Sequence, residues 1–127
     1  MKKMKNIINT DKAPAAIGSY SQAVKAGNTV YISGQIPLNL EGELVMTSIE
    51  DQTEQVLKNL QAILQTAGGD FENVVKATVF TDDISYFGEI NEVYGKYFDE
   101  EPPARAFVEV AALPKGVNVE IEAIAVI

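Results

Sequence analysis

Residues 48–80 read SIEDQTEQVLKNLQAILQTAGGDFENVVKATVF, and the hydrophobic period changes within this stretch. Up to about residue 67, apolar side chains recur at spacings of three and four residues, which is typical of an amphipathic helix. Ser48 followed by Asp51 predicts the N-terminal cap of that helix, and Gly68-Gly69 predicts its end. Residues 74–80 are β-branched and mostly apolar, which predicts a central strand.

Upstream of this stretch, the pattern indicates β-structure. Residues 30–33 alternate between the two faces of a strand, and the turn-forming residues 34–37 end it. Residues 38–47 then form a hairpin or a loop, with Glu41-Gly42 as its turn.

Downstream, the spacing of apolar residues predicts a second helix over about residues 83–98. Pro102-Pro103 keeps the chain extended after it. The last quarter has the pattern of a hairpin, with strands at 105–112 and 117–127 around a turn at 113–116.

These elements predict an α+β fold, in which two helices pack on one face of a mixed β-sheet. A length of 127 residues predicts a single domain, 1–127. The last strand carries apolar residues on both faces near its end, so the second sheet face is covered either by loops or by a partner subunit.

The charge and hydropathy of the chain restrict its partners. With 18 acidic against 10 basic residues, the formal net charge is -8, which disfavours binding to nucleic acid or to an anionic membrane. No apolar run approaches the length of a membrane span or follows the N-terminal lysines as in a signal peptide. We therefore predict a cytoplasmic protein with neither nucleic acid nor a membrane as its partner.

The chain contains no cysteine and no histidine. This excludes thiol nucleophiles, Ser-His-Asp triads, Cys/His zinc sites and imidazole acid-base catalysis. Carboxylates, lysine, tyrosine, hydroxyls, backbone groups, bound water and Arg105 remain for chemistry, and we expect neither a metal nor a cofactor.

Arg105 is the only arginine, beside nine lysines. Its planar guanidinium matches a carboxylate with two parallel hydrogen bonds, so it is a candidate anchor for a carboxylate ligand. An ordinary salt bridge to one of the acidic residues is the alternative. The alternation of a strand places Arg105, Phe107 and Glu109 on one face, and assigns Ala106 and Val108 on the other face to the core.

Glu120 and Glu122 share one face of the last strand, either as solvated residues or as a pair of carboxylates near the arginine. A symmetric hairpin would place Glu120 opposite Glu109, and Arg105 near Ala123 or Ile124. The register alone therefore does not bring Arg105 to Glu120, although a bulge or a site shared between subunits would. Glu109, Glu120 and Glu122 together would raise the pKa of one carboxyl group.

Four further residues are candidates from their local setting. Tyr20 either binds a ligand or packs, and Ser33 and Gly34 present backbone groups at a turn where glycine permits close approach. Asn91 lies among apolar positions of the second predicted helix, where a buried amide needs a partner.

Several motifs together resemble the RidA/YjgF family of reactive-intermediate deaminases. They run in order along nearly the whole chain: residues 13–23 (APAAIGSYSQA), 33–37 (SGQIP), 74–80 (VVKATVF), 91–94 (NEVY), 103–105 (PAR), 113–115 (LPK) and 119–125 (VEIEAIA). The resemblance implies a fold similar to chorismate mutase of the Bacillus type, assembled as a homotrimer with a barrel-like core and clefts between subunits. It also implies the hydrolysis of reactive 2-imino acids, such as 2-iminobutanoate and 2-iminopropanoate, to 2-keto acids and ammonia.

Carried over by position, the resemblance assigns the substrate carboxylate to Arg105, the attacking water to Glu120 and a place in the cleft to Tyr20. Ser33, Gly34 and Asn91 match positions that contact ligand, and Phe107 stands where several relatives have cysteine, a change that narrows the pocket or alters the substrate range. A non-catalytic binding or regulatory protein for 2-keto acids is the alternative. Endoribonuclease activity, also attached to this family, is disfavoured by the net charge of -8.

Overall fold

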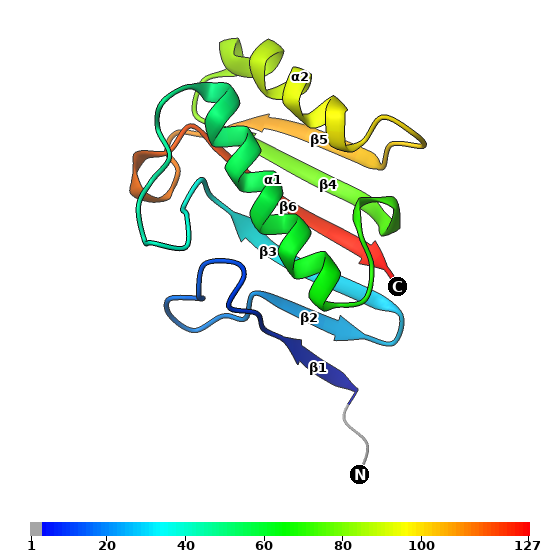
Figure 1. Ribbon diagram of the computed structural model, residues 1–127. Coiled ribbons are helices and arrows are strands. Elements are labelled where there is room, and N and C mark those ends of the chain that lie inside the picture. Colours follow the sequence, from blue (N-terminus) through cyan, green and yellow to red (C-terminus); the bar gives the residue numbers. More distant parts are fainter. Residues whose placement is uncertain (1–3) are drawn as a thin grey trace.

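The computed structural model describes residues 4–127, which form one six-stranded sheet with two α-helices on the same face (Figure 1). The strands are β1 (Lys5–Ile8), β2 (Ala23–Ala26), β3 (Thr29–Gln35), β4 (Val74–Thr81), β5 (Ala104–Glu109) and β6 (Val119–Val126). Their order across the sheet is β1-β2-β3-β6-β4-β5, and only β4 and β5 run parallel. The mixed sheet with two helices confirms the predicted α+β class.

Helix α1 (Ile49–Thr66) forms as the sequence predicts. The Ser48 hydroxyl accepts a hydrogen bond from the backbone N–H of Asp51 at 2.9 Å, and Gly68 adopts a φ of +99° just beyond the helix. The apolar stripe of α1 is wholly buried against the sheet: Val56, Leu57, Leu60, Ile63 and Leu64. Burial of each such side chain contributes about 1.5–3 kcal/mol, so this stripe fixes the helix on the sheet.

The second predicted helix divides into two parts. A 3-10 turn, Ile84–Tyr86, is capped by Asp83 and leads into helix α2 (Phe87–Tyr97). Ile90, Val93 and Tyr94 face the core, and the hydroxyl of Tyr97 donates to Glu54 of α1. Burial and this carboxylate raise the pKa of Tyr97 to about 12, so the contact between the helices keeps its proton at neutral pH. Neither helix is both long and apolar enough to cross a bilayer, nor is any other helical segment of residues 4–127.

The predicted C-terminal hairpin is wrong. Strand β5 pairs with β4 in parallel, through the crossover that contains α2, whereas β6 lies between β3 and β4. The segment 113–116 does turn, as a short 3-10 helix at Pro114–Gly116. It leads the chain to the far side of β4, where β6 pairs with β4, instead of back along β5. Local turn chemistry is compatible with both paths, and the parallel pairing with β4 decides between them.

Two short strands lie outside the sequence prediction. β1 and β2 extend the sheet beyond β3, with Ile7 opposite Val24 and Val24 opposite Tyr31. Each has four residues, too few for the alternation of a strand to stand out in the sequence.

The sheet face opposite the helices is not covered by another layer of residues 4–127 (Figure 1). The register places Ala106 beside Thr78, and Val108 beside Phe80, on this face, and Val108 is 39% exposed. The prediction that Ala106 and Val108 are core residues is therefore wrong for the single chain. Arg105 and Phe107 face α2 instead, because their register partners Ala77 and Val79 lie in the core beneath the helices.

Candidate active site

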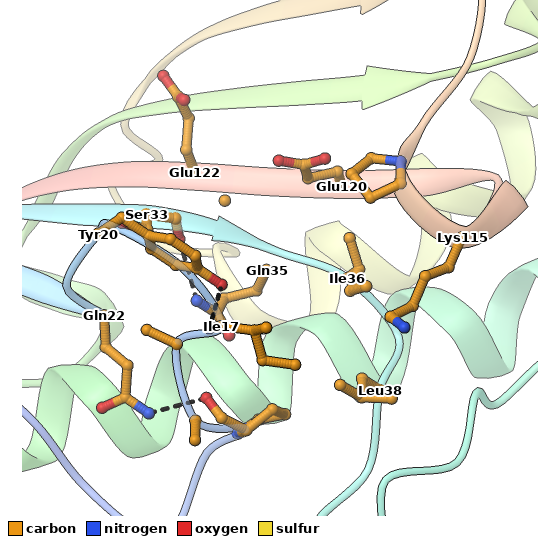
Figure 2. A pocket seen from close by; sticks show the side chains of 15 residues that line it. Ile17, Tyr20, Gln22, Ser33, Gln35, Ile36, Leu38, Lys115, Glu120 and Glu122 are labelled. Carbon is orange, nitrogen blue, oxygen red and sulfur yellow. Dashed lines mark hydrogen bonds between the residues drawn. The ribbon is translucent and has the colours of Figure 1, made fainter.

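A cavity of about 650 Å³ opens at one end of the sheet, where the segment before β2, the end of β3 and the start of β6 meet. Its lining combines the predicted site residues Tyr20, Ser33, Gly34 and Glu120 with apolar groups such as Ile17, Ile36 and Leu38. Figure 2 shows Tyr20 and Ser33 together on one side of it and Lys115 at the other. This combination of an apolar wall and a few polar groups is typical of a small-molecule site.

Glu120 is the carboxyl group of this cavity whose pKa is shifted by its surroundings. The side chain is half-buried, and burial raises the pKa of its carboxyl group, with Glu122 two residues along the same strand face adding a like-charge effect. The prediction that neighbouring acids raise one carboxyl pKa is confirmed in direction, although burial is the larger cause. Glu109 does not contribute to this pKa shift. Its carboxylate lies on the other side of the sheet, where it accepts a hydrogen bond from the backbone N–H of Ile84 at 2.8 Å.

A β-bulge shapes the cavity beside Glu120. Ile32 pairs with Ala123 and Gln35 with Ile121, so Ser33 and Gly34 together oppose Glu122 alone. A Cβ atom on Gly34 would lie 2.0 Å from Oε2 of Glu120. The carboxylate can therefore rest against β3 only because residue 34 is a glycine. This contact explains the glycine more directly than the turn that the sequence indicated.

Ser33 and Tyr20 are both tied to neighbouring backbone. The Ser33 hydroxyl donates to the carbonyl of Ser21 at 2.6 Å, and the Tyr20 hydroxyl accepts from the backbone N–H of Ile17 at 3.4 Å. Tyr20 remains 53% exposed, so its ring lines the cavity instead of packing in the core.

Three residues that sequence reasoning did not assign support this cavity. The buried side chain of Gln22 donates to the carbonyls of Thr10 and Pro14 at 3.0 and 2.9 Å, and so holds the segment that carries Tyr20. Figure 2 draws one of these two hydrogen bonds. Asn118 bonds to Gln52 of α1 and to Asp82 and so fixes the start of β6. Lys115 lines the rim with a φ of +57°, a conformation that is rare without glycine. The positions of Gln22 inside the motif at 13–23 and of Lys115 inside the motif at 113–115 are the only sequence signals of these roles.

Arg105 lies elsewhere, between β5 and α2. Its Nη1 donates to Oδ1 of Asn91 at 2.9 Å, and both residues line a second cavity of about 330 Å³ with Tyr94 and Phe98. Asn91 is exposed, so the expectation of a buried amide is wrong, and its partner is Arg105. Within residues 4–127 the hydrogen-bond partner of Arg105 is this neutral amide, so Arg105 does not form the salt bridge that was the alternative interpretation.

The structure separates the two halves of the predicted site. Glu120 pairs with Phe80, whose neighbour on β5 is Val108, and these three side chains lie on the uncovered face. Arg105 lies beside Ala77 on the helix-covered face, with β4 between β5 and β6. Within one chain the sheet itself stands between Arg105 and Glu120. Among residues 4–127, no group of three or more acidic side chains is placed to hold a metal ion.

Comparison with known proteins gives consistent results. Residues 10–127 match the family described as Endoribonuclease L-PSP. The chain is 54% identical over 124 residues to 2-iminobutanoate/2-iminopropanoate deaminase of Rattus norvegicus, covering 97% of this chain and 90% of that protein.

Solved structures agree with the fold. The crystal structure of RidA from an Antarctic Psychrobacter superposes with a TM-score of 0.92 at 54% identity, covering 96% of this chain and 99% of that one. The structure of E. coli TdcF with bound serine gives a TM-score of 0.90 at 46% identity, covering 96% and 98%.

Proposed function

We propose that this chain, which belongs to the Endoribonuclease L-PSP family of RidA and YjgF proteins, is an enzyme that hydrolyses reactive 2-imino acids to 2-keto acids and ammonia. The observation that carries this conclusion is its nearly full-length similarity to an enzyme named for 2-iminobutanoate and 2-iminopropanoate deamination. A site without histidine, cysteine or metal suffices, because a protonated imine is already a strong electrophile.

The reaction requires one well-placed acid-base group. Water adds to C2 of the imine, a C–O bond forms, the C=N π electrons move to nitrogen, and Glu120 accepts the proton of the water. Glu120 then returns a proton to the amine nitrogen. The C–N bond breaks with its electron pair on nitrogen, the carbonyl forms as the hydroxyl proton passes to the Glu120 carboxylate, and ammonia leaves. A carboxyl group with a raised pKa suits both steps, because it holds and releases a proton nearer to neutral pH.

The other residues bind and orient. Arg105 anchors the substrate carboxylate with its guanidinium, assisted by Asn91, and Tyr20 closes the cavity around the reacting carbon. Ser33 and Gly34 supply backbone groups next to Glu120. The serine bound to TdcF supports a small carboxylate as the ligand class.

The separation of Arg105 from Glu120 supports a site completed by a second copy of the chain. The uncovered sheet face carries apolar side chains, among them Tyr31, Ile124 and Val108, that a neighbouring copy would bury. In a homotrimer these faces would enclose a barrel-like core, as in chorismate mutase of the Bacillus type. Arg105 of one copy would then reach the Glu120 cavity of the next. The cytoplasmic location and a role in removing damaging metabolites stay predictions.

Mixing two impaired variants tests the shared site. Arg105→Ala and Glu120→Gln chains, each strongly impaired alone, are denatured and refolded together. If Arg105 and Glu120 of one site come from different copies, random assembly of a closed ring brings an unmutated Arg105 to an unmutated Glu120 in at most about one quarter of the sites. Activity should therefore recover to about that fraction. No recovered activity, with a trimer established by sedimentation, would place both residues in one chain, contrary to the proposal.

The reaction itself is tested with freshly generated 2-iminobutanoate, by following the rate of 2-ketobutanoate formation with and without protein. We expect acceleration that Arg105→Ala reduces about 30-fold or more. Binding of 2-ketobutanoate without any acceleration would instead identify the non-catalytic binding protein.

The family description also raises RNA cleavage as a second activity. The net charge of -8 opposes it, because RNA binding requires basic side chains along the phosphate backbone. We expect no cleavage of single-stranded RNA under conditions of full deaminase activity.

A further inference from the structure

Three aromatic side chains surround the guanidinium of Arg105. Its Cζ lies 4.7 Å from the ring centroid of Tyr94, 5.6 Å from that of Phe107 and 5.8 Å from that of Phe87. All three distances fall within the range of about 6 Å over which a cation is attracted to the face of an aromatic ring. Phe87 and Phe107 also pack on each other, with centroids 4.8 Å apart, so the rings support one another as well as the cation.

Aromatic faces hold a cation without neutralising it. The guanidinium carries five N–H donors, and Asn91 takes one of them through a neutral amide oxygen. A carboxylate neighbour would occupy the same pair of donors that a ligand carboxylate needs. With rings in place of an acid, the side chain is restrained while its charge and its remaining donors stay available.

We propose that Phe87, Tyr94 and Phe107 form an aromatic cage that positions the guanidinium of Arg105 to receive the carboxylate of the ligand. Phe87 and Phe107 are then positioning residues that act through Arg105 and need not touch the reacting atoms. The inference rests on the proposed function only in taking Arg105 as the carboxylate anchor.

The cage also accounts for the phenylalanine at position 107. Its ring packs on Phe87 at the start of α2 and on the edge of the core, so it is directed toward the helix. Phe107 therefore affects substrate binding through the orientation of the guanidinium. This differs from the narrowing of the pocket that the sequence alone indicated.

The test separates aromatic character from apolar volume. Phe107→Leu and Phe87→Leu keep an apolar side chain but remove the ring face, whereas Phe107→Tyr keeps the face. We expect each leucine variant to raise the Kd of 2-ketobutanoate about 3- to 10-fold by calorimetry, since a partly exposed cation-π contact has this magnitude. The KM for 2-iminobutanoate should rise by the same factor, while kcat stays within about twofold and Phe107→Tyr binds like wild type.

Phe71→Leu is the matched control, because Phe71 packs on Tyr97 and Phe98 in the core and lies outside the cage. It should lower thermal stability without changing the Kd. Equal binding by wild type and both leucine variants would overturn the cage, as would a tyrosine variant as weak as the leucine one. If Phe107→Leu does not fold, Phe87→Leu decides alone, since that ring is 42% exposed.

Failure of the proposed reaction has a different signature. Wild-type protein that binds 2-ketobutanoate but hydrolyses no imine, with the leucine variants still weakening binding, would refute the deaminase and support the cage. Absence of any 2-ketobutanoate binding would refute both.

Discussion

The two faces of one sheet carry the two groups of predicted site residues, and the electrostatic surroundings of the two groups differ. On the uncovered face, burial beside Glu122 disfavours the charge of Glu120. On the helix-covered face, Arg105 is held by an amide oxygen and three rings, none of which carries negative charge. A carboxyl group whose ionisation burial disfavours is unfavourable for stability, whereas the partly exposed guanidinium costs little without an acidic partner. This difference is what we expect if each half of the proposed site is organised for a group that the single chain does not supply.

The largest effect is expected on the uncovered face. Glu120→Gln keeps the shape of the side chain but removes its ability to take a proton, so kcat should fall about 10²- to 10⁴-fold, the usual contribution of general acid-base catalysis. Steady-state rates with 2-iminobutanoate measure this, and binding of 2-ketobutanoate should change little. A loss of less than about fivefold would assign proton transfer to another group.

On the helix-covered face, the expected effect is smaller and falls on binding. Arg105→Ala should lower kcat/KM by about 30-fold or more, because it removes a charged hydrogen-bonding partner of the substrate. Arg105→Lys should recover only part of this, since an ammonium cannot form the paired hydrogen bonds. Full recovery with lysine would mean that charge alone anchors the substrate.

Gly34→Ala sharpens the role of the bulge. The new Cβ would overlap the carboxylate of Glu120, so that group must move, and kcat should fall about tenfold. The free energy of unfolding should change little, because the overlapping group is the end of a flexible side chain. Gly88→Ala is the control, because a Cβ there meets nothing within 4 Å. Wild-type kinetics in Gly34→Ala would show that the resting position of Glu120 is not used in catalysis.

The smallest effect concerns pH. Glu122→Gln removes a like charge that raises the pKa of Glu120, so the acidic limb of the kcat/KM profile should move to lower pH. The raised folded-state pKa also means that Glu120 contributes stability at low pH that is lost as pH rises through that pKa. Glu122→Gln should therefore raise the melting temperature at neutral pH more than at pH 4. If the acidic limb of the profile does not move in Glu122→Gln, burial alone raises the pKa of Glu120.

Much of the fold follows from local sequence. The stripe of α1 with Ser48 and Gly68 at its ends, the apolar run of β4 and the turn after Leu113 all appear where the pattern places them. These are short-range features, because caps, turns and periodicity involve residues within a few positions of one another. Strands β1 and β2 were not predicted, because each has four residues, too few for an alternating pattern to be recognised.

The site residues could be selected from the sequence, but their arrangement could not. A single arginine among nine lysines and the motifs around it select Arg105, Asn91, Tyr20 and Glu120. The hairpin inferred from the turn at 113–116 put the last two strands side by side, whereas β6 inserts between β3 and β4. Strand pairing is a long-range choice that depends on which faces the helices cover, and adjacent positions in the sequence carry no record of it.

The sequence by itself therefore determined the chemical groups, the α+β class and the absence of thiol and imidazole chemistry. Only the tertiary structure decided that Arg105 and Glu120 face opposite sides of the sheet, that Gly34 makes room for a carboxylate, and that Phe107 packs beside the guanidinium. Composition and hydrophobic period can be read along the sequence. The face and the bulge come from the pairing of strands that are distant in the chain, and the rings around Arg105 come from the packing of α2 against β5.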